Sequence, residues 1–137
     1  MKLTTKSEYG LLILIGLARM KALPGSTIFV RLETICKENN LSMKYAEQQA
    51  SALKKSKLVI ARRGAGGGYQ LARGPEDINM AQIIRLMDGA LAPIGSVSAY
   101  FPSHTLLESE PSVLHVMQDI RDYVACKMEQ TRLSDLL

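Results

Sequence analysis

One glycine-rich segment limits the folds open to this chain more than any other feature of its sequence. The residues from Arg63 to Gly68 read Arg-Gly-Ala-Gly-Gly-Gly, and they separate two short runs with strand character, Leu58 to Arg62 and Tyr69 to Ala72. Two short strands joined by a segment that contains glycine are typical of a β-hairpin. The sequence therefore predicts a hairpin whose tip carries little side-chain bulk.

Two short helices are expected immediately before this hairpin. From Val30 to Lys37 the apolar residues follow helical spacing, and the pair Asn39-Asn40 then favours a turn. Ser42 is a natural N-cap for a second helix from Met43 to about Lys55, which has a narrow apolar stripe and a polar outer face. Two short helices joined by a tight turn indicate a helix-turn-helix, and a hairpin that follows directly makes it a winged helix.

Three further helices are expected around this unit. The first runs from about Lys6 to Met20, with a capping box at Thr5–Glu8 and an apolar surface on almost every side. The second is capped by Asn79 and ended by Gly89. The third runs from Ser112 to about Gln130, after a stretch of turn-forming residues that predicts loops or short turns.

The last helix carries an apolar stripe with a period of roughly 3.5 residues. A long stripe attached to a small domain needs a surface to cover it, and a matching helix from a second subunit is the simplest one. We therefore predict a homodimer whose interface contains Val113, Val116, Met117, Ile120, Tyr123, Val124 and Met128.

These elements predict a mainly α-helical fold with a small β-hairpin. We expect a winged helix-turn-helix domain over residues 1–75, a linking helix and loop over 76–110, and a dimerisation helix with its tail over 111–137. A length of 137 residues suits one domain with a short appended element.

The charge of the chain is unevenly distributed along it. Residues 1–73 hold 13 Lys and Arg against 4 Asp and Glu, a balance of +9, whereas residues 74–137 hold 4 against 9, or −5; the two sum to the net +4 of the chain. Excess positive charge attracts polyanions, and double-stranded DNA is the expected partner. No membrane-length apolar run and no secretory leader are recognised, and the two cysteines are interpreted as reduced thiols, so we expect a cytoplasmic protein.

The expected DNA-binding residues lie on the second short helix and on the hairpin. Lysine and tyrosine near a helix start suit phosphate or base-edge contacts, glutamate accepts from cytosine and glutamine pairs with adenine. Arginines at a glycine-rich tip are able to enter a minor groove or bind phosphate. The candidates are Ser42, Lys44, Tyr45, Glu47, Gln48, Arg62, Arg63, Gly64, Gly66, Gly67 and Tyr69.

Other interpretations have less support. The glycines match neither the dinucleotide fingerprint nor the phosphate loop, and no catalytic set surrounds His104 or His115, so we expect no enzyme. Cys36 is expected in the core, and Cys126 is a candidate redox switch. Two alternatives stay open: a regulator of the same fold that responds to a small-molecule effector or to thiol oxidation, and a protein-interaction module that does not bind DNA.

Four segments of the chain resemble the Rrf2 family of bacterial winged-helix regulators. They are the opening residues Met1 to Gly10, Lys44-Tyr45-Ala46-Glu47-Gln48, the hairpin from Arg62 to Ala72, and Leu91-Ala92-Pro93-Ile94. The resemblance implies a homodimeric regulator, most simply a repressor, on palindromic promoter DNA. It places the second helix of the helix-turn-helix in the major groove and the hairpin in the adjacent minor groove. It also implies DNA contacts by Tyr45, Glu47, Gln48 and Arg63.

One departure from the family pattern bears on cofactors. Many relatives hold an iron–sulfur cluster through three cysteines after the Leu-Ala-Pro segment, but this chain has Ser96 and Ser103 and no cysteine there. Serine is a poor substitute for the thiolates that hold such clusters. Glu8 aligns with a position that supplies a non-cysteine ligand in some relatives, but one carboxylate does not hold a cluster. We therefore predict no metal and no cofactor, in a cluster-free branch of the family or in a variant that has lost its ligand cysteines.

Overall fold

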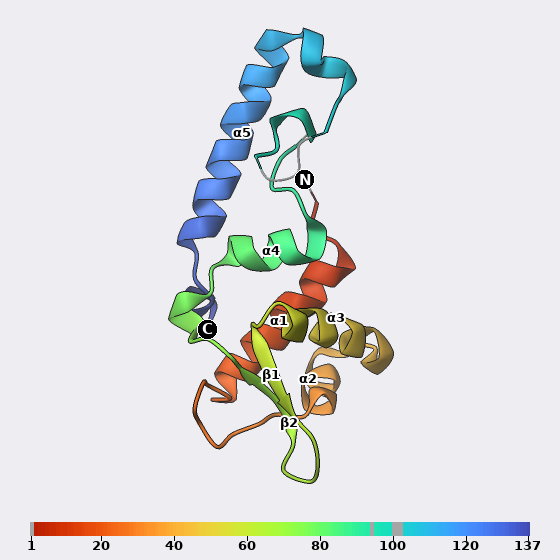
Figure 1. The fold of residues 1–137 in the computed structure, drawn as a ribbon, viewed down its shortest axis with the longest axis vertical. Helices are drawn as coiled ribbons and strands as arrows, with labels where there is room; N and C mark the ends of the chain where they lie inside the picture. The colour runs from red at the N-terminus through yellow and green to blue at the C-terminus, as the bar shows by residue number, and fades with distance from the viewer. Residues whose placement is uncertain (1, 94, 100–102) are drawn as a thin grey trace.

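The computed structural model of the chain is shown in Figure 1 and describes residues 2–93, 95–99 and 103–137. Met1 and Ile94, which belong to the motifs quoted above, lie outside the described residues, as do residues 100–102. The described residues form helices α1 (Thr5–Arg19), α2 (Leu32–Asn39), α3 (Met43–Lys55), α4 (Met80–Asp88) and α5 (Pro111–Gln130), and strands β1 (Val59–Arg62) and β2 (Gly68–Leu71). Short 3-10 turns occupy Pro75–Asp77, Gly95–Val97, Leu106–Ser109 and Leu133–Leu136.

The mainly helical class with one small hairpin is confirmed. The two strands are antiparallel, with Val59 opposite Leu71 and Arg62 opposite Gly68. Val30 adds a third short stretch to this sheet, because its amide and carbonyl both bond to the backbone of Tyr69, at 2.9 and 2.8 Å. The helix-turn-helix of α2 and α3 is thereby tied to the hairpin through the backbone.

Side-chain caps explain where two of the helices begin. The Ser42 hydroxyl accepts from the backbone amide of Tyr45 at the start of α3. At the start of α4, Asn79 and Gln82 form the reciprocal pair of a capping box, with bonds of 2.9 and 3.0 Å. The helix starts inferred from these two residues are confirmed.

The capping box expected at Thr5–Glu8 is wrong. Thr5 is already helical, and Thr4 is the N-cap but makes no side-chain cap bond. Its hydroxyl donates instead to the carboxylate of Asp88 at the end of α4. A long-range partner has therefore replaced the local one, and it joins the start of α1 to the end of α4.

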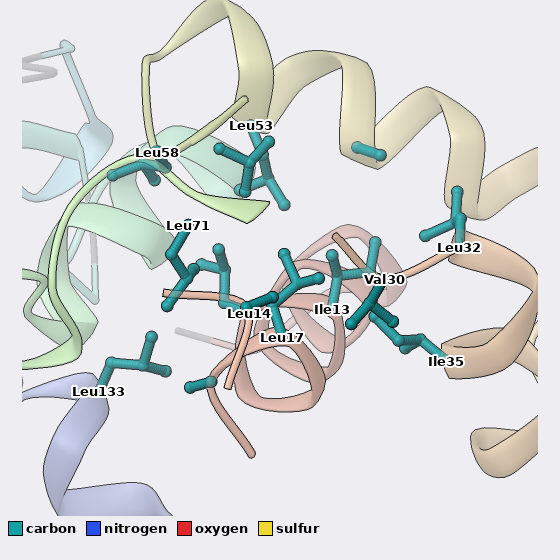
Figure 2. Packing of buried hydrophobic residues seen from close by; sticks show 14 of the residues in the cluster. Ile13, Leu14, Leu17, Val30, Leu32, Ile35, Leu53, Leu58, Leu71 and Leu133 are labelled. Atoms are coloured by element: carbon teal, nitrogen blue, oxygen red, sulfur yellow. The ribbon is translucent and has the colours of Figure 1, made fainter. Parts of the chain in front are cut away.

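The core is built around α1, because this helix buries apolar side chains on several sides. Figure 2 shows Ile13, Leu14 and Leu17 of α1 surrounded by apolar residues from α2, α3 and the hairpin, among them Ile35, Leu53, Leu58 and Leu71. Ile13, Leu14 and Leu17 are fully buried. The many-sided apolar character of the first helix thus reflects packing on more than one face.

The C-terminal end of the chain returns to this same core. Leu133 is fully buried in the main cluster, together with Ile78 and Ile83. Its amide donates to the Ile78 carbonyl at 2.8 Å, and the Met80 amide donates to the Thr131 carbonyl at 2.7 Å. One hydrophobic cluster therefore contains residues from all three expected segments. The domain boundaries after residues 75 and 110 stay a prediction.

Helix α5 extends away from α1, α2, α3 and the hairpin, and the segment that follows α4 runs beside it (Figure 1). No residue of α5 is buried, although Met128 packs against a small cluster formed by Ala81, Ile84 and Leu91. Within the described residues, no helix combines the length and the apolar character needed to cross a membrane.

Candidate nucleic-acid interface

The start of α3 presents a polar face to solvent. Lys44, Glu47 and Gln48 are exposed, and Ser42 caps the helix beside them. The opposite side of α3 is anchored by Ala46, Ala50 and Leu53, which are fully buried. The inner face of α3 is thus packed into the core, and its outer face carries hydrogen-bonding groups of the kind that contact base edges.

Tyr45, which is expected at the DNA, packs against another aromatic ring within the chain. It is only partly exposed, and its ring meets that of Tyr9 edge to face, with centroids 4.7 Å apart and planes at 87°. The hydroxyl oxygen of Tyr9 also accepts a hydrogen bond from the Ser42 amide at 2.9 Å. Helix α1 therefore sets the position of the α3 N-terminus, and Tyr9 is a site residue that local spacing did not indicate.

The hairpin tip requires glycine at two positions, because other backbone passes very close to each. A Cβ on Gly67 would lie 2.2 Å from the carbonyl oxygen of Arg62, and one on Gly68 would lie 2.5 Å from the Val30 carbonyl. Both are far inside contact distance with backbone, so a side chain at either position forces the loop to move. The glycine run thus allows a tight loop that packs directly on the strand beside it.

The two hairpin arginines differ in their surroundings. Arg62 donates to the Gly66 carbonyl at 2.6 Å and lies over the Phe29 ring, 4.2 Å from its centroid. Arg63 is exposed, and within the described part of the chain its side chain forms no hydrogen bond or ion pair. Arg62 therefore shapes the loop, and Arg63 is the guanidinium available to a ligand.

Arg31 is a further residue of this hairpin that the sequence did not reveal. Its guanidinium donates to the carbonyls of Gly64 and Ala65 at 3.3 and 3.1 Å. Arg31 precedes α2, and the carbonyls that it holds lie 33 and 34 residues later in the chain. The periodicity of the sequence does not predict contacts over that separation. The excess of basic residues in the first half of the chain indicated only that cations gather in this part of the protein.

Three exposed arginines lie around the hairpin loop. Gly64 and Gly66 are exposed at the tip, Gly67 is buried beneath it, and Tyr69 is partly buried where it pairs with Val30. The loop projects from the end of the molecule opposite the far end of α5 (Figure 1). Arg31, Arg62 and Arg63 gather three positive charges around a loop of little bulk, which suits contact with a phosphate backbone or a narrow groove.

The segment after Leu91-Ala92-Pro93, where many relatives hold an iron–sulfur cluster, carries hydroxyl, imidazole and carboxylate groups in this chain. Ser96 and Thr105 share a hydrogen bond of 2.8 Å, and His104 Nδ1 lies 2.9 Å from a carboxylate oxygen of Glu108. Within the described residues, no three His, Cys, Asp or Glu side chains gather as metal ligands. This donor set does not fit an iron–sulfur cluster, which needs thiolates.

The two thiols lie apart from this segment. Cys36 is buried in the main core, as expected, and burial and the nearby carboxylates Glu33 and Glu47 raise its pKa, which disfavours the reactive thiolate. Cys126 is exposed on α5.

A helix-turn-helix with an exposed polar second helix, joined through the backbone to a basic glycine-tipped hairpin, defines a winged helix-turn-helix DNA-binding protein. The model of the Rrf2 family, described as iron-dependent transcriptional regulator, matches residues 3–137. The chain therefore belongs to the Rrf2 family and is a transcription regulator.

Named relatives agree with this membership. The HTH-type transcriptional regulator CymR of Bacillus subtilis is 38% identical over 136 residues, which cover 99% of this chain and 89% of the relative. The regulator IscR of Cereibacter sphaeroides is 29% identical over 137 residues, covering 100% of this chain and 87% of IscR.

Solved structures agree as well. The structure of Bacillus subtilis CymR has a TM-score of 0.82 and 36% identity, covering 99% of this chain and 95% of CymR. The oxidized form of Staphylococcus aureus CymR has a TM-score of 0.77 and 33% identity, with the same coverage of 99% and 95%.

Proposed function

We propose that the protein is a cytoplasmic, homodimeric repressor that binds a palindromic promoter site. Each subunit places Ser42, Lys44, Glu47 and Gln48 of α3 in a major groove, and Arg63 in the adjacent minor groove. Phosphate contacts then supply much of the affinity, and the exposed side chains of α3 read the bases. Family membership favours this interpretation over a protein-interaction module that ignores DNA.

The exposed apolar face of α5 carries the proposal of a dimer. Val116, Ile120 and Tyr123 are 53%, 45% and 75% exposed on a helix that extends into solvent. Beside them is a hollow of about 190 Å³ lined by apolar atoms of Ile120, Val124 and residues 91–93. Large apolar side chains that remain together in water mark an interface, and a second copy of the same helix is self-complementary across a two-fold axis.

Not every residue of the expected stripe faces outward. Val113, Met117 and Val124 are partly buried, and Met128 packs against α4 within the same chain. We therefore propose that the exposed face of α5, with Val116, Ile120 and Tyr123, contacts the partner helix. Met128 instead attaches α5 to its own subunit. Two DNA-binding units related by a two-fold axis then require a DNA site with inverted repeats.

Selection of genomic DNA fragments by the purified protein tests this function. We expect enriched fragments to share an inverted repeat that overlaps promoters, with affinity that falls steeply as salt rises. Sedimentation should show two chains per particle, and deletion of the gene should raise transcription from the selected promoters. Enrichment without any shared sequence, or full operator affinity by a monomer, would contradict the proposal.

A paired substitution on α5 separates dimerisation from folding. Changing both Val116 and Ile120 to Glu places charges on the exposed face without touching the core, so we expect monomers that fold normally but bind the operator weakly. The matched control is Gln118→Glu, at an exposed position of α5 between those two. If the double variant remains dimeric, the interface lies elsewhere.

A further inference from the structure

A second hollow lies between α4, residues 91, 98 and 99, and α5, remote in the chain from the elements proposed to contact DNA. Its volume is about 250 Å³, and charged and apolar groups both line it. Arg85 comes from α4, while Arg121, Asp122 and Glu129 come from α5. Leu91 and Ala125 supply apolar wall. The cavity is smaller than the roughly 300–1,000 Å³ of most drug-sized ligand sites, so its size suits a small metabolite.

The charged groups of this cavity are already held in place. Arg85 Nη2 lies 2.9 Å from Glu129 Oε1, and Arg121 Nη2 lies 2.8 Å from Asp122 Oδ1. Arg121 Nη1 also donates to the Val97 carbonyl at 2.7 Å, which ties α5 to the segment before it. Both arginine side chains are about three-quarters buried, at 21% and 26% exposure, whereas the two carboxylates are 47% and 66% exposed.

We propose that this cavity binds a small zwitterion of the amino-acid class. Two guanidiniums and two carboxylates line this cavity, so its formal charge is zero. Both positive and negative groups are nevertheless available to a ligand. A ligand carboxylate is suited to a guanidinium, which binds such groups through parallel N–H donors, and a ligand ammonium is suited to Asp122 or Glu129. A short apolar side chain then lies against Leu91 and Ala125.

The same charges argue against other small ligands. A phosphate or dicarboxylate meets two carboxylates as well as two arginines, and an amine without a carboxylate meets two guanidiniums. Each of these ligands leaves one pair of cavity charges facing its own sign, which costs binding energy in a partly desolvated space. A molecule that carries both signs a few atoms apart satisfies both pairs.

The cavity and the proposed dimer face use different sides of α5. Arg121, Ala125 and Glu129 follow each other at intervals of four residues and so lie along one side of the helix. Val116 and Ile120 form a separate row, which faces solvent. A second copy on that row therefore does not use the α5 residues that line the cavity.

A ligand in this cavity bridges α4 and α5, and α4 is joined to the DNA-binding part. Met87 of α4 fits against Gly10 of α1, where an added Cβ would lie 2.9 Å from the Met87 methyl group. Asp88 also bonds to Thr4 at the start of α1. We therefore expect ligand binding to change operator affinity; this consequence rests on the proposed function, whereas binding itself does not.

Titration calorimetry on the full chain tests the inference, with each of the twenty amino acids as the probe. We expect one or a few to bind saturably at a single site. For each that binds, the α-hydroxy acid that lacks the ammonium, the amine that lacks the carboxylate, and inorganic phosphate should bind about tenfold more weakly or worse. Saturable binding by no amino acid, or equal binding by the hydroxy acid or the amine, overturns the proposal.

Three neutralising variants locate the site. Asp122→Asn and Glu129→Gln keep the side-chain size but remove the charge for the ammonium, and each should weaken binding by about tenfold. Asp119→Asn, on α5 outside the cavity, is the matched control and should leave affinity within about twofold. Equal effects of all three overturn the assignment. Because Asp122 is largely exposed, its variant should fold even if Glu129→Gln does not.

Operator binding without ligand is measured in parallel on the same preparations. Absence of amino-acid binding by the unmodified chain, with intact operator binding, refutes the cavity assignment alone. Absence of operator binding by a protein that still binds an amino acid refutes the proposed function alone.

Discussion

The hydroxyl oxygen of Tyr9 accepts a hydrogen bond from the backbone amide of Ser42 over 2.9 Å. This contact joins α1 to the N-cap of α3, 33 residues later in the chain. The residue that caps α3 is therefore held by a side chain from the central helix of the core. The start of a helix is where its backbone N–H groups lack partners, so a group that orders this position also orders the side chains that follow.

We expect Tyr9→Phe to lower the free energy of unfolding by about 0.5–1.5 kcal/mol, because it removes this bond and keeps the ring contact with Tyr45. Urea denaturation followed by circular dichroism measures the change. Tyr45→Phe is the control, since it removes a hydroxyl from the other ring of the same pair. An equal loss in both variants would mean that the bond to Ser42 adds nothing of its own.

Arg63→Ala should weaken operator binding by about 1–3 kcal/mol and leave the unfolding midpoint unchanged, since this exposed side chain has DNA as its proposed partner. Fluorescence anisotropy over a series of salt concentrations should also show a log–log slope about one unit shallower. Lys127→Ala, an equal loss of charge on α5, should leave both quantities as they are. Unchanged binding by Arg63→Ala would remove the hairpin from the proposed interface.

Arg31→Ala should loosen the hairpin loop rather than remove a base contact. The guanidinium holds the carbonyls of Gly64 and Ala65, so its loss frees the loop backbone. Faster amide hydrogen exchange at residues 64–67, with little change in the rest of the chain, is the expected result. Arg73→Ala, whose guanidinium bonds to the Asp77 carbonyl at 2.6 Å, is the control outside the hairpin loop. If exchange in the loop stays the same, the loop keeps its shape without Arg31.

Asp88 should make folding sensitive to acid. Burial raises the pKa of its carboxyl, but the neighbouring Ser7 hydroxyl, hydrogen bonds from the Thr4 hydroxyl and amide, and the charge of Lys6 outweigh this, and the net pKa lies below its ordinary value. A carboxyl with a lowered pKa in the folded state stabilises the fold above about pH 4 and loses that contribution as the pH falls through the folded pKa.

Asp88→Asn should therefore lower stability at pH 7 by about 0.5–1.5 kcal/mol and flatten the loss of stability below about pH 4. Thermal unfolding over that pH range provides the measurement, with Asp77→Asn as the control at an exposed carboxylate. A profile of Asp88→Asn parallel to that of the unmodified chain would assign the acid sensitivity to other groups.

Leu133→Ala should destabilise the fold by about 2–5 kcal/mol, because it empties a fully buried position in the main core. Leu137→Ala is the control, since Leu137 is 51% exposed, and it should change stability by less than about 0.5 kcal/mol. Chemical denaturation compares the two. Similar small effects would show that the C-terminal tail does not contribute to the core that it contacts.

Local chemistry in the sequence was enough to predict most of the elements. The spacing of apolar residues, the caps at Ser42 and Asn79 and the glycine run set the helices, the hairpin and the polar outer face of α3, because these signals act between residues within a few positions of each other. The class of the fold follows from them, and the family from the resemblance of the four quoted segments to the Rrf2 pattern.

The tertiary structure decided which side chains meet over long separations. It paired Tyr9 with Ser42, gave Thr4 to Asp88 instead of to its own helix, placed Arg31 against the hairpin loop and gathered Arg85 with Glu129. Such contacts depend on how the helices pack in three dimensions. Local patterns of neighbouring residues in the sequence do not predict that packing.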